Sequence, residues 1–147
     1  MFHRRRIVLV TCLGVVASLV SACDSGLCGN EVQFQVKAPD GLHHAVVFQR
    51  DCGATTGFST QISVLKGPGP TATKDLPNRP GNAYVADTNK DASPAAPWGG
   101  PAVDLSWLSA TRLVIKSHPA TRVFTKPSTI NGVDVIYDNG VSVAPGG

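Results

Sequence analysis

Beyond its first six positions, this 147-residue chain has no cluster of basic residues. Three of its 13 Lys and Arg residues lie together at Arg4, Arg5 and Arg6, and the rest of the chain has as many basic as acidic residues. A protein that binds nucleic acid needs a basic stripe that displaces counterions from phosphates. We therefore expect no nucleic-acid partner.

The sequence also lacks the short motifs that mark common active sites. Ser59 lies in GFSTQ and not in a Gly-x-Ser-x-Gly elbow, no Gly-Lys-Ser/Thr follows a glycine-rich loop, and the Cys and His residues do not have the spacing of zinc ligands. The histidines outside the N-terminal segment, His43, His44 and His118, are expected to be solvated at the surface. We expect neither an enzyme nor a bound cofactor or metal ion.

The chain has one long uncharged run, at residues 7–22, directly after MFHRRR. It is shorter than the roughly 20 apolar residues that span a bilayer, and a basic patch followed by such a run is typical of an export signal. The run leads into Val20, Ser21, Ala22 and Cys23. These four residues resemble the bacterial lipobox. The resemblance implies cleavage before Cys23, a diacylglyceryl group on its sulfur and a fatty acyl chain such as palmitate on its amine.

The lipobox divides the chain into three expected parts. Residues 1–22 are a signal peptide, expected as a helix, residues 23–30 are the lipidated N-terminus with a short tether, and residues 31–147 are one all-β domain. The lipid chains make a membrane the expected partner, with an envelope protein as a further candidate. Asp24 resembles the signal that retains enteric-type lipoproteins in the inner membrane, so we expect the domain on the periplasmic side of that membrane.

Cysteine is rare, with four in the whole chain. Cys12 lies within the uncharged run and is expected to be an ordinary apolar residue there. Removal of the signal leaves Cys23, Cys28 and Cys52, and this odd number argues against a plain secretory signal with Cys23 as a structural cysteine. With Cys23 lipidated, Cys28 and Cys52 are expected to form a disulfide across the first predicted hairpin.

Residues that break helices recur along the chain, which has 15 Gly and 11 Pro, and they favour short strands. Within residues 32–37, Val32, Phe34 and Val36 alternate with polar residues, which predicts a strand with these three on one face. Residues 45–50 are its expected hairpin partner. Further strands are expected at 60–65, 82–87, 102–108, 112–117, 122–126 and 133–138. About seven or eight short strands favour a small antiparallel sandwich or open barrel with long loops.

Two long segments rich in Pro and Gly, residues 66–82 and 88–101, are expected to be surface loops. Trp98 lies in the second loop, where an exposed aromatic side chain would favour contact with a sugar or a protein partner. Trp107 instead continues the alternation of a predicted strand, which favours a place in the core.

The segment RDCGATTGFST, at residues 50–60, has two interpretations. Its glycines and hydroxyls can form a tight corner that is pinned by the disulfide. Alternatively, its amides and the hydroxyls of Thr55, Thr56 and Ser59 can form a nest that binds an anion or a sugar hydroxyl. Together with Trp98, these three residues are the candidate binding residues.

The mature part resembles a family of small uncharacterised bacterial proteins. The resemblance is carried by CGATTGFST at residues 52–60, by GNAYVAD ending at residue 87, and by WGGP at residues 98–101. It implies a shared domain and no particular activity.

Two hypotheses for function follow. The first is a non-catalytic envelope lipoprotein that acts as a scaffold or binds a protein partner. The second is a periplasmic domain that binds a small molecule or glycan through the loops at residues 53–60 and 88–101. The second hypothesis predicts that these two loops converge on a hollow, whereas the first allows them to lie apart.

Overall fold

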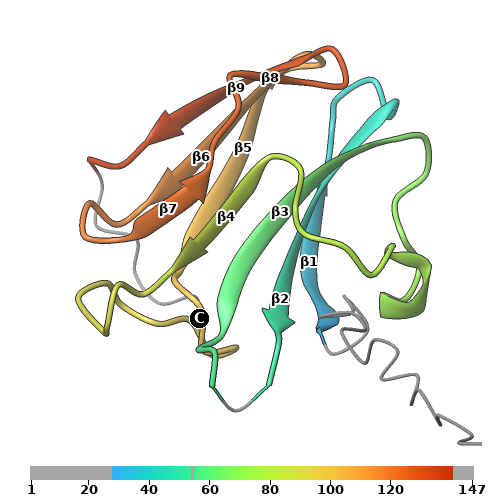
Figure 1. Cartoon of the computed structure of the whole chain (residues 1–147). Coiled ribbons are helices and arrows are strands. Elements are labelled where there is room, and N and C mark those ends of the chain that lie inside the picture. Colours follow the sequence, from blue (N-terminus) through green and yellow to red (C-terminus); the bar gives the residue numbers. More distant parts are fainter. Residues whose placement is uncertain (1–27, 54, 141–147) are drawn as a thin grey trace, which may run out of the picture.

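The structure is a computed structural model that describes residues 28–53 and 55–140. In this part of the chain two β-sheets pack face to face (Figure 1), which confirms the predicted all-β sandwich. The strands are β1 (Gly29–Lys37), β2 (His43–Asp51), β3 (Ser59–Lys66), β4 (Tyr84–Asp87), β5 (Val103–Ser109), β6 (Arg112–Ser117), β7 (Arg122–Thr125), β8 (Thr129–Ile130) and β9 (Val133–Asp138), and a short 3-10 helix, η2, covers Thr73–Asp75. β1 thus begins before the expected domain start at residue 31.

The expected signal helix, the lipobox and Cys23 lie outside the described residues. Among the residues that the structure does describe, there is no helix with the length and apolar character needed to cross a bilayer.

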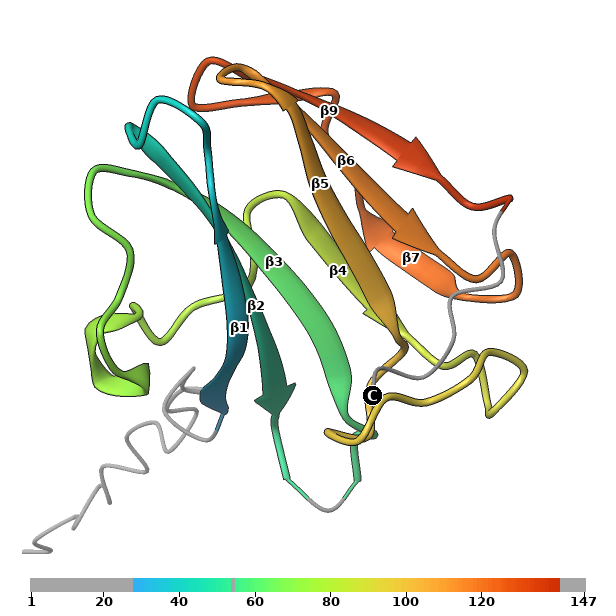
Figure 2. The ribbon, with the colours of Figure 1, turned by 180° about the vertical axis from the view of Figure 1, so that it is seen from behind.

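One sheet has the strand order β1-β2-β3-β4-β7 and the other β5-β6-β9-β8 (Figure 2). Neighbouring strands are antiparallel except β6 and β9, which are parallel. This pair departs from the expected antiparallel pairing, because the chain leaves the four-stranded sheet after β6, adds β7 to the other sheet and returns through β8. The alternation of apolar residues did not predict β8, which has only two residues.

The main core lies between the two sheets and consists of inward-facing side chains from both. Its fully buried members include Val47, Ile62, Tyr84, Leu113 and Ile115. Trp107 packs against this core, as expected, and its indole N–H donates to the carbonyl oxygen of Val36 at 3.0 Å. This bond joins β5 of one sheet to β1 of the other.

A β-bulge at Gln33 overturns one expectation for β1. The register of β1 against β2 shifts between Val32 and Phe34. Phe34 packs against the core between the sheets, whereas Val32 packs with Val46 and Phe48 on the opposite face. Val32 and Phe34 therefore do not share a face, because the extra residue of a bulge reverses the alternation that follows it.

The loop at residues 66–82 is not a free surface excursion. It crosses the outer face of the five-stranded sheet, where Leu76 is buried against Val46 and Phe48 of β2. β2 is consequently covered on both faces, which accounts for its unbroken apolar run at residues 45–48. The loop thus acts as a third, partial layer of the domain.

The histidines are less exposed than expected. His44 is buried on the outer face of β2, and its Nδ1 lies 2.7 Å from the carbonyl oxygen of Gly67 in the covering loop. His43 and His118 are half-buried, and Nδ1 of His118 accepts the backbone N–H of Ala120 at 3.2 Å. The expectation rested on the nearby turn and strand end, and for His44 it is wrong because the loop at 66–82 covers that face of the sheet. His43 instead lies against Asn131, with its Nε2 3.3 Å from the carbonyl oxygen of that residue.

Cys28 and Cys52 form a disulfide, as predicted. Gly29 and Asp51, the residues just inside the two cysteines, are partners in the β1–β2 register. The disulfide therefore closes the open end of the first hairpin, and it holds the start of β1 beside the loop that follows β2.

Candidate ligand-binding site

The loop after β2 is organised by its own polar groups. Asp51 Oδ1 accepts the backbone N–H of Gly53 at 2.8 Å, and the Thr56 hydroxyl donates to the carbonyl oxygen of Gly53 at 3.1 Å. The Ser59 hydroxyl donates to the carbonyl oxygen of Arg50 at 3.2 Å. Gly53 has φ of 100°, a left-handed conformation that favours glycine. These two hydroxyls therefore donate hydrogen bonds to backbone carbonyl groups and stabilise a tight corner.

The loop at residues 88–101 packs back onto the sandwich at Trp98. The indole N–H of Trp98 donates to the Thr60 hydroxyl at 2.8 Å, and this hydroxyl donates to the carbonyl oxygen of Pro101 at 2.7 Å. The ring centroids of Trp98 and Phe34 lie 6.1 Å apart. Trp98 is thus half-buried against the core, which corrects the expectation of an exposed side chain.

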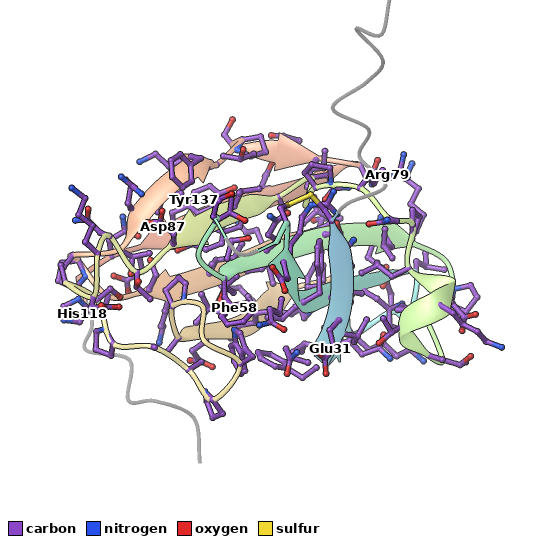
Figure 3. All side chains as sticks on the ribbon, turned by 60° about the horizontal axis from the view of Figure 1, so that its bottom comes forward. Glu31, Phe58, Arg79, Asp87, His118 and Tyr137 are labelled. Atoms are coloured by element: carbon purple, nitrogen blue, oxygen red, sulfur yellow. A yellow bond between two sulfur atoms is a disulfide. The ribbon has the colours of Figure 1, made fainter. Side chains whose placement is uncertain are left out.

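The two loops meet at Phe58 and Gly99. A Cβ atom built on Gly99 would lie 2.5 Å from Cδ2 of Phe58, so the ring packs directly on the glycine backbone. Gly99 has φ of 87°, and a larger residue would be disfavoured there on both counts. Phe58 nevertheless keeps 45% of its surface exposed. Viewed onto this end of the molecule, it lies between Glu31 and Asp87 (Figure 3).

A first hollow of about 440 Å³ lies on the Glu31 side of Phe58. Its volume is within the range of about 300–1,000 Å³ that is usual for small-molecule sites. The lining residues are Glu31, Gln33, Gln49, Phe58, Pro97, Trp98 and Gly99. They combine two aromatic side chains with two carboxamides and one carboxylate, and none of them is basic.

The carboxamides of the first hollow are held in place by backbone oxygens. Gln49 Nε2 donates to the carbonyl oxygen of Trp98 at 2.6 Å, and Gln33 Nε2 donates to that of Glu31 at 3.2 Å. Neither carboxamide oxygen has a hydrogen-bond partner within the described residues. Both oxygens can therefore accept hydrogen bonds from a bound hydroxyl.

A second hollow of about 380 Å³ lies on the other side of Phe58 and Gly99. Its polar side includes Asp87, Lys90 and Arg122. Arg122 Nε donates to Asp87 Oδ1 at 3.1 Å, and this guanidinium lowers the pKa of the Asp87 carboxyl. The Asp87 charge is thus already paired, which leaves Lys90, Asp91 and Thr88 as its other polar groups.

The wall of the second hollow has an unusual backbone. Asn89, Lys90 and Asp91 have φ of 52°, 56° and 65°, which is rare for non-glycine residues. Asp87 Oδ1 accepts the backbone N–H of Asn89 at 2.8 Å, and Asn89 Nδ2 donates to the carbonyl oxygen of Ala120 at 3.2 Å. These bonds hold the turn against the sandwich.

The predicted site residues divide into two groups. Trp98 lines the first hollow, whereas Thr55, Thr56 and Ser59 line neither hollow. The hydroxyls of Thr56 and Ser59 face backbone groups of the corner, and Thr55 is exposed.

Sequence reasoning missed four residues that line the first hollow: Glu31, Gln33, Gln49 and Phe58. One signal was available in the alternation of β2. Gln49 follows Ala45 and Val47 at a spacing of two residues, so it is a polar residue on the inner face of this strand. Phe58 gave no signal by periodicity, since it lies between strands.

Within residues 28–53 and 55–140, no three His, Cys, Asp or Glu side chains gather where they could hold a metal ion. No protein-family model matches the chain, and comparisons with curated proteins and with solved structures give no match either. The resemblance to small bacterial proteins stays a prediction.

Proposed function

We propose that this protein is a lipid-anchored, non-catalytic binding protein of the cell envelope, whose ligand is a neutral saccharide held at the first hollow. The observation that carries this proposal is the meeting of the loops at residues 53–60 and 88–101, where Phe58 packs on Gly99. The glycan-binding hypothesis requires that convergence.

The chemistry of the first hollow favours a saccharide. A sugar ring has apolar C–H faces, which pack well on aromatic side chains such as Phe58 and Trp98, and a rim of hydroxyls that need hydrogen-bond partners. The carboxamide oxygens of Gln33 and Gln49 offer such partners beside the rings. Because no basic side chain lines this hollow, a neutral ligand fits better than an anionic one.

The position of Phe58 favours a ligand of more than one sugar unit. Phe58 and Gly99 line both hollows, so the Phe58 ring forms a ridge between them. A chain of sugars can cross such a ridge, with one unit in each hollow. The exposed part of Phe58 is the apolar surface that the ligand would cover.

The anchor is proposed from the lipobox at residues 20–23 and from the cysteine count. Cys28 is tied to Cys52, next to the corner that leads to Phe58. Five residues beyond Cys23 reach at most about 18 Å, so an anchored domain would keep this end close to the bilayer. Replacement of Cys23 by Ser tests the anchor. It should release the protein from membranes or leave an uncleaved precursor, and a mature-sized membrane protein would contradict the anchor.

A scaffold role is the second candidate, and it has a different surface in its favour. Leu108 of β5 and Ile136 of β9 are 62% and 39% exposed. Ile136 alternates with the core residues Val135 and Tyr137, which places it on the outer face of the four-stranded sheet, whereas Leu108 lies at the register shift between Trp107 and Ser109. Neither residue lines a hollow beside Phe58. A protein partner found by crosslinking in the native membrane and lost with Leu108→Asp would favour the scaffold.

A glycan array tests the saccharide proposal. The purified full chain is applied in a polyoxyethylene detergent, which carries no sugar to compete with the ligand. We expect saturable binding to one family of neutral saccharides. Binding to no saccharide, or only to acidic ones with a strong salt dependence, would contradict the proposal.

A further inference from the structure

A separate hollow of about 570 Å³ lies on the outer face of the five-stranded sheet, beneath the loop at residues 66–82. Arg79, one of its lining residues, lies well away from Phe58 (Figure 3). None of the residues that line the two hollows beside Phe58 lines this one. It is therefore an independent candidate site.

The loop that roofs this hollow is fixed by side chains of the sheet. Asn30 Nδ2 donates to the carbonyl oxygen of Arg79 at 3.0 Å, and Arg50 Nη1 donates to Asn78 Oδ1 at 3.0 Å. Gln61 Oε1 accepts the backbone N–H of Gly81 at 2.8 Å. The hollow is consequently preformed, and a ligand need not order the loop when it binds.

The lining of the hollow combines apolar walls with positive charge. Leu65, Leu76 and three prolines form its apolar part, and Lys66 and Arg79 are its charged residues. No Asp or Glu is among the described residues that line it. In the described part of the chain the only ion pair joins Arg122 to Asp87, so Lys66 and Arg79 have no carboxylate partner there.

Ser63 adds a hydrogen-bond donor to the same wall. It is 7% exposed, and its hydroxyl oxygen accepts the backbone N–H of Asn82 at 3.4 Å. The hydroxyl proton itself has no acceptor among the described residues. A hydroxyl donor and two unpaired cations beside an apolar wall suit an acceptor with negative charge.

We propose that this hollow binds a small organic carboxylate with a compact apolar body. The carboxylate would accept hydrogen bonds from Lys66, Arg79 and Ser63. The apolar body would cover Leu65 and Leu76. Charge complementarity and the preformed walls select this class over a neutral apolar compound, which would leave both cations without a partner.

Titration of the full chain with naphthalene-2-carboxylate, followed by backbone amide NMR shifts, tests the proposal. These shifts change only at residues near the bound compound, so they distinguish binding to the hollow from partition of the compound into detergent. We expect saturating shifts at residues 63–66 and at the non-proline residues of 76–82. The neutral analogue naphthalene-2-methanol should bind at least tenfold more weakly.

Three variants complete the test. Lys66→Met and Arg79→Met should each weaken carboxylate binding at least fivefold, and both side chains are exposed, so folding should be unaffected. Lys116→Met, on the four-stranded sheet, is the matched control and should bind like the original chain. Equal binding of the neutral analogue, shifts that do not saturate at these residues, or equal losses in all three variants would overturn the proposal.

Discussion

The indole N–H of Trp98 donates to the hydroxyl of Thr60, whose own proton goes to the carbonyl oxygen of Pro101. Thr60 is fully buried on β3. One hydroxyl thus holds both the aromatic wall of the first hollow and the end of the loop at residues 88–101.

Replacement of Thr60 by Val keeps the shape of the side chain and removes both bonds. The indole N–H and the Pro101 carbonyl lose their partner, so the free energy of unfolding should fall by about 2 kcal/mol. Thr125→Val is the control, because the Thr125 hydroxyl has no hydrogen bond within the described residues. Urea unfolding should place that control within about 0.5 kcal/mol of the original protein. Equal effects of the two changes would show that the Thr60 bonds contribute little.

Leu76 is expected to fasten the loop at residues 66–82 to the sheet. It is 6% exposed and packs on Val46 and Phe48. Leu76→Ala should lower the free energy of unfolding by about 2–3 kcal/mol, and trypsin should cut faster after Lys74. Leu108→Ala, at a 62% exposed residue, should change neither quantity. Unchanged cleavage in Leu76→Ala would mean that polar contacts alone hold the loop.

Loss of the hydroxyl should affect the stability of the fold differently at the two stacked tyrosines of the core. Their ring centroids lie 6.4 Å apart. The Tyr137 hydroxyl lies 2.7 Å from the carbonyl oxygens of Ala83 and Pro127, whereas the buried Tyr84 hydroxyl has no well-formed hydrogen bond in the described part of the chain. Tyr137→Phe should destabilise the fold by about 1–2 kcal/mol, and Tyr84→Phe should leave stability unchanged or raise it by up to about 1 kcal/mol. Thermal unfolding of both variants distinguishes them, and a larger loss in Tyr84→Phe would contradict this account.

Tyr137 should also make the fold sensitive to alkali. Burial raises the pKa of its hydroxyl above the usual value, and the neighbouring Tyr84 raises it further. The folded state holds this proton more tightly than the unfolded state. The contribution of Tyr137 to the free energy of unfolding is therefore fully present below about pH 10 and is lost as the pH rises further. The difference in unfolding free energy between the original protein and Tyr137→Phe should therefore shrink above about pH 10. A difference that stays constant up to about pH 11 would contradict this prediction.

Much of the sandwich could be predicted from the sequence because its strands are short and bounded by Gly and Pro. Alternation located all strands except β8. It failed within β1, where the bulge at Gln33 places Val32 and Phe34 on opposite faces. A bulge changes the backbone without changing composition, so periodicity cannot reveal it.

The candidate site was harder to predict than the fold. The loops at residues 53–60 and 88–101 could be singled out by their Gly, Pro and Thr content. Which side chains face a ligand depends on contacts between distant segments, however. Thr56 and Ser59 turn toward their own corner, whereas Glu31 and Gln49, far apart in sequence, become cross-strand partners beside Phe58.

The central claim is that a saccharide covers the exposed face of Phe58. The most direct measurement is calorimetric titration of the full chain with the saccharide selected by the array, comparing Phe58→Ala with Leu42→Ala. Leu42 is 63% exposed and lies between β1 and β2, at the end of the first hairpin opposite the disulfide, so it controls for loss of an exposed apolar side chain. We predict that Phe58→Ala weakens binding at least tenfold while Leu42→Ala binds like the original protein. Equal affinity of the two variants would contradict the claim.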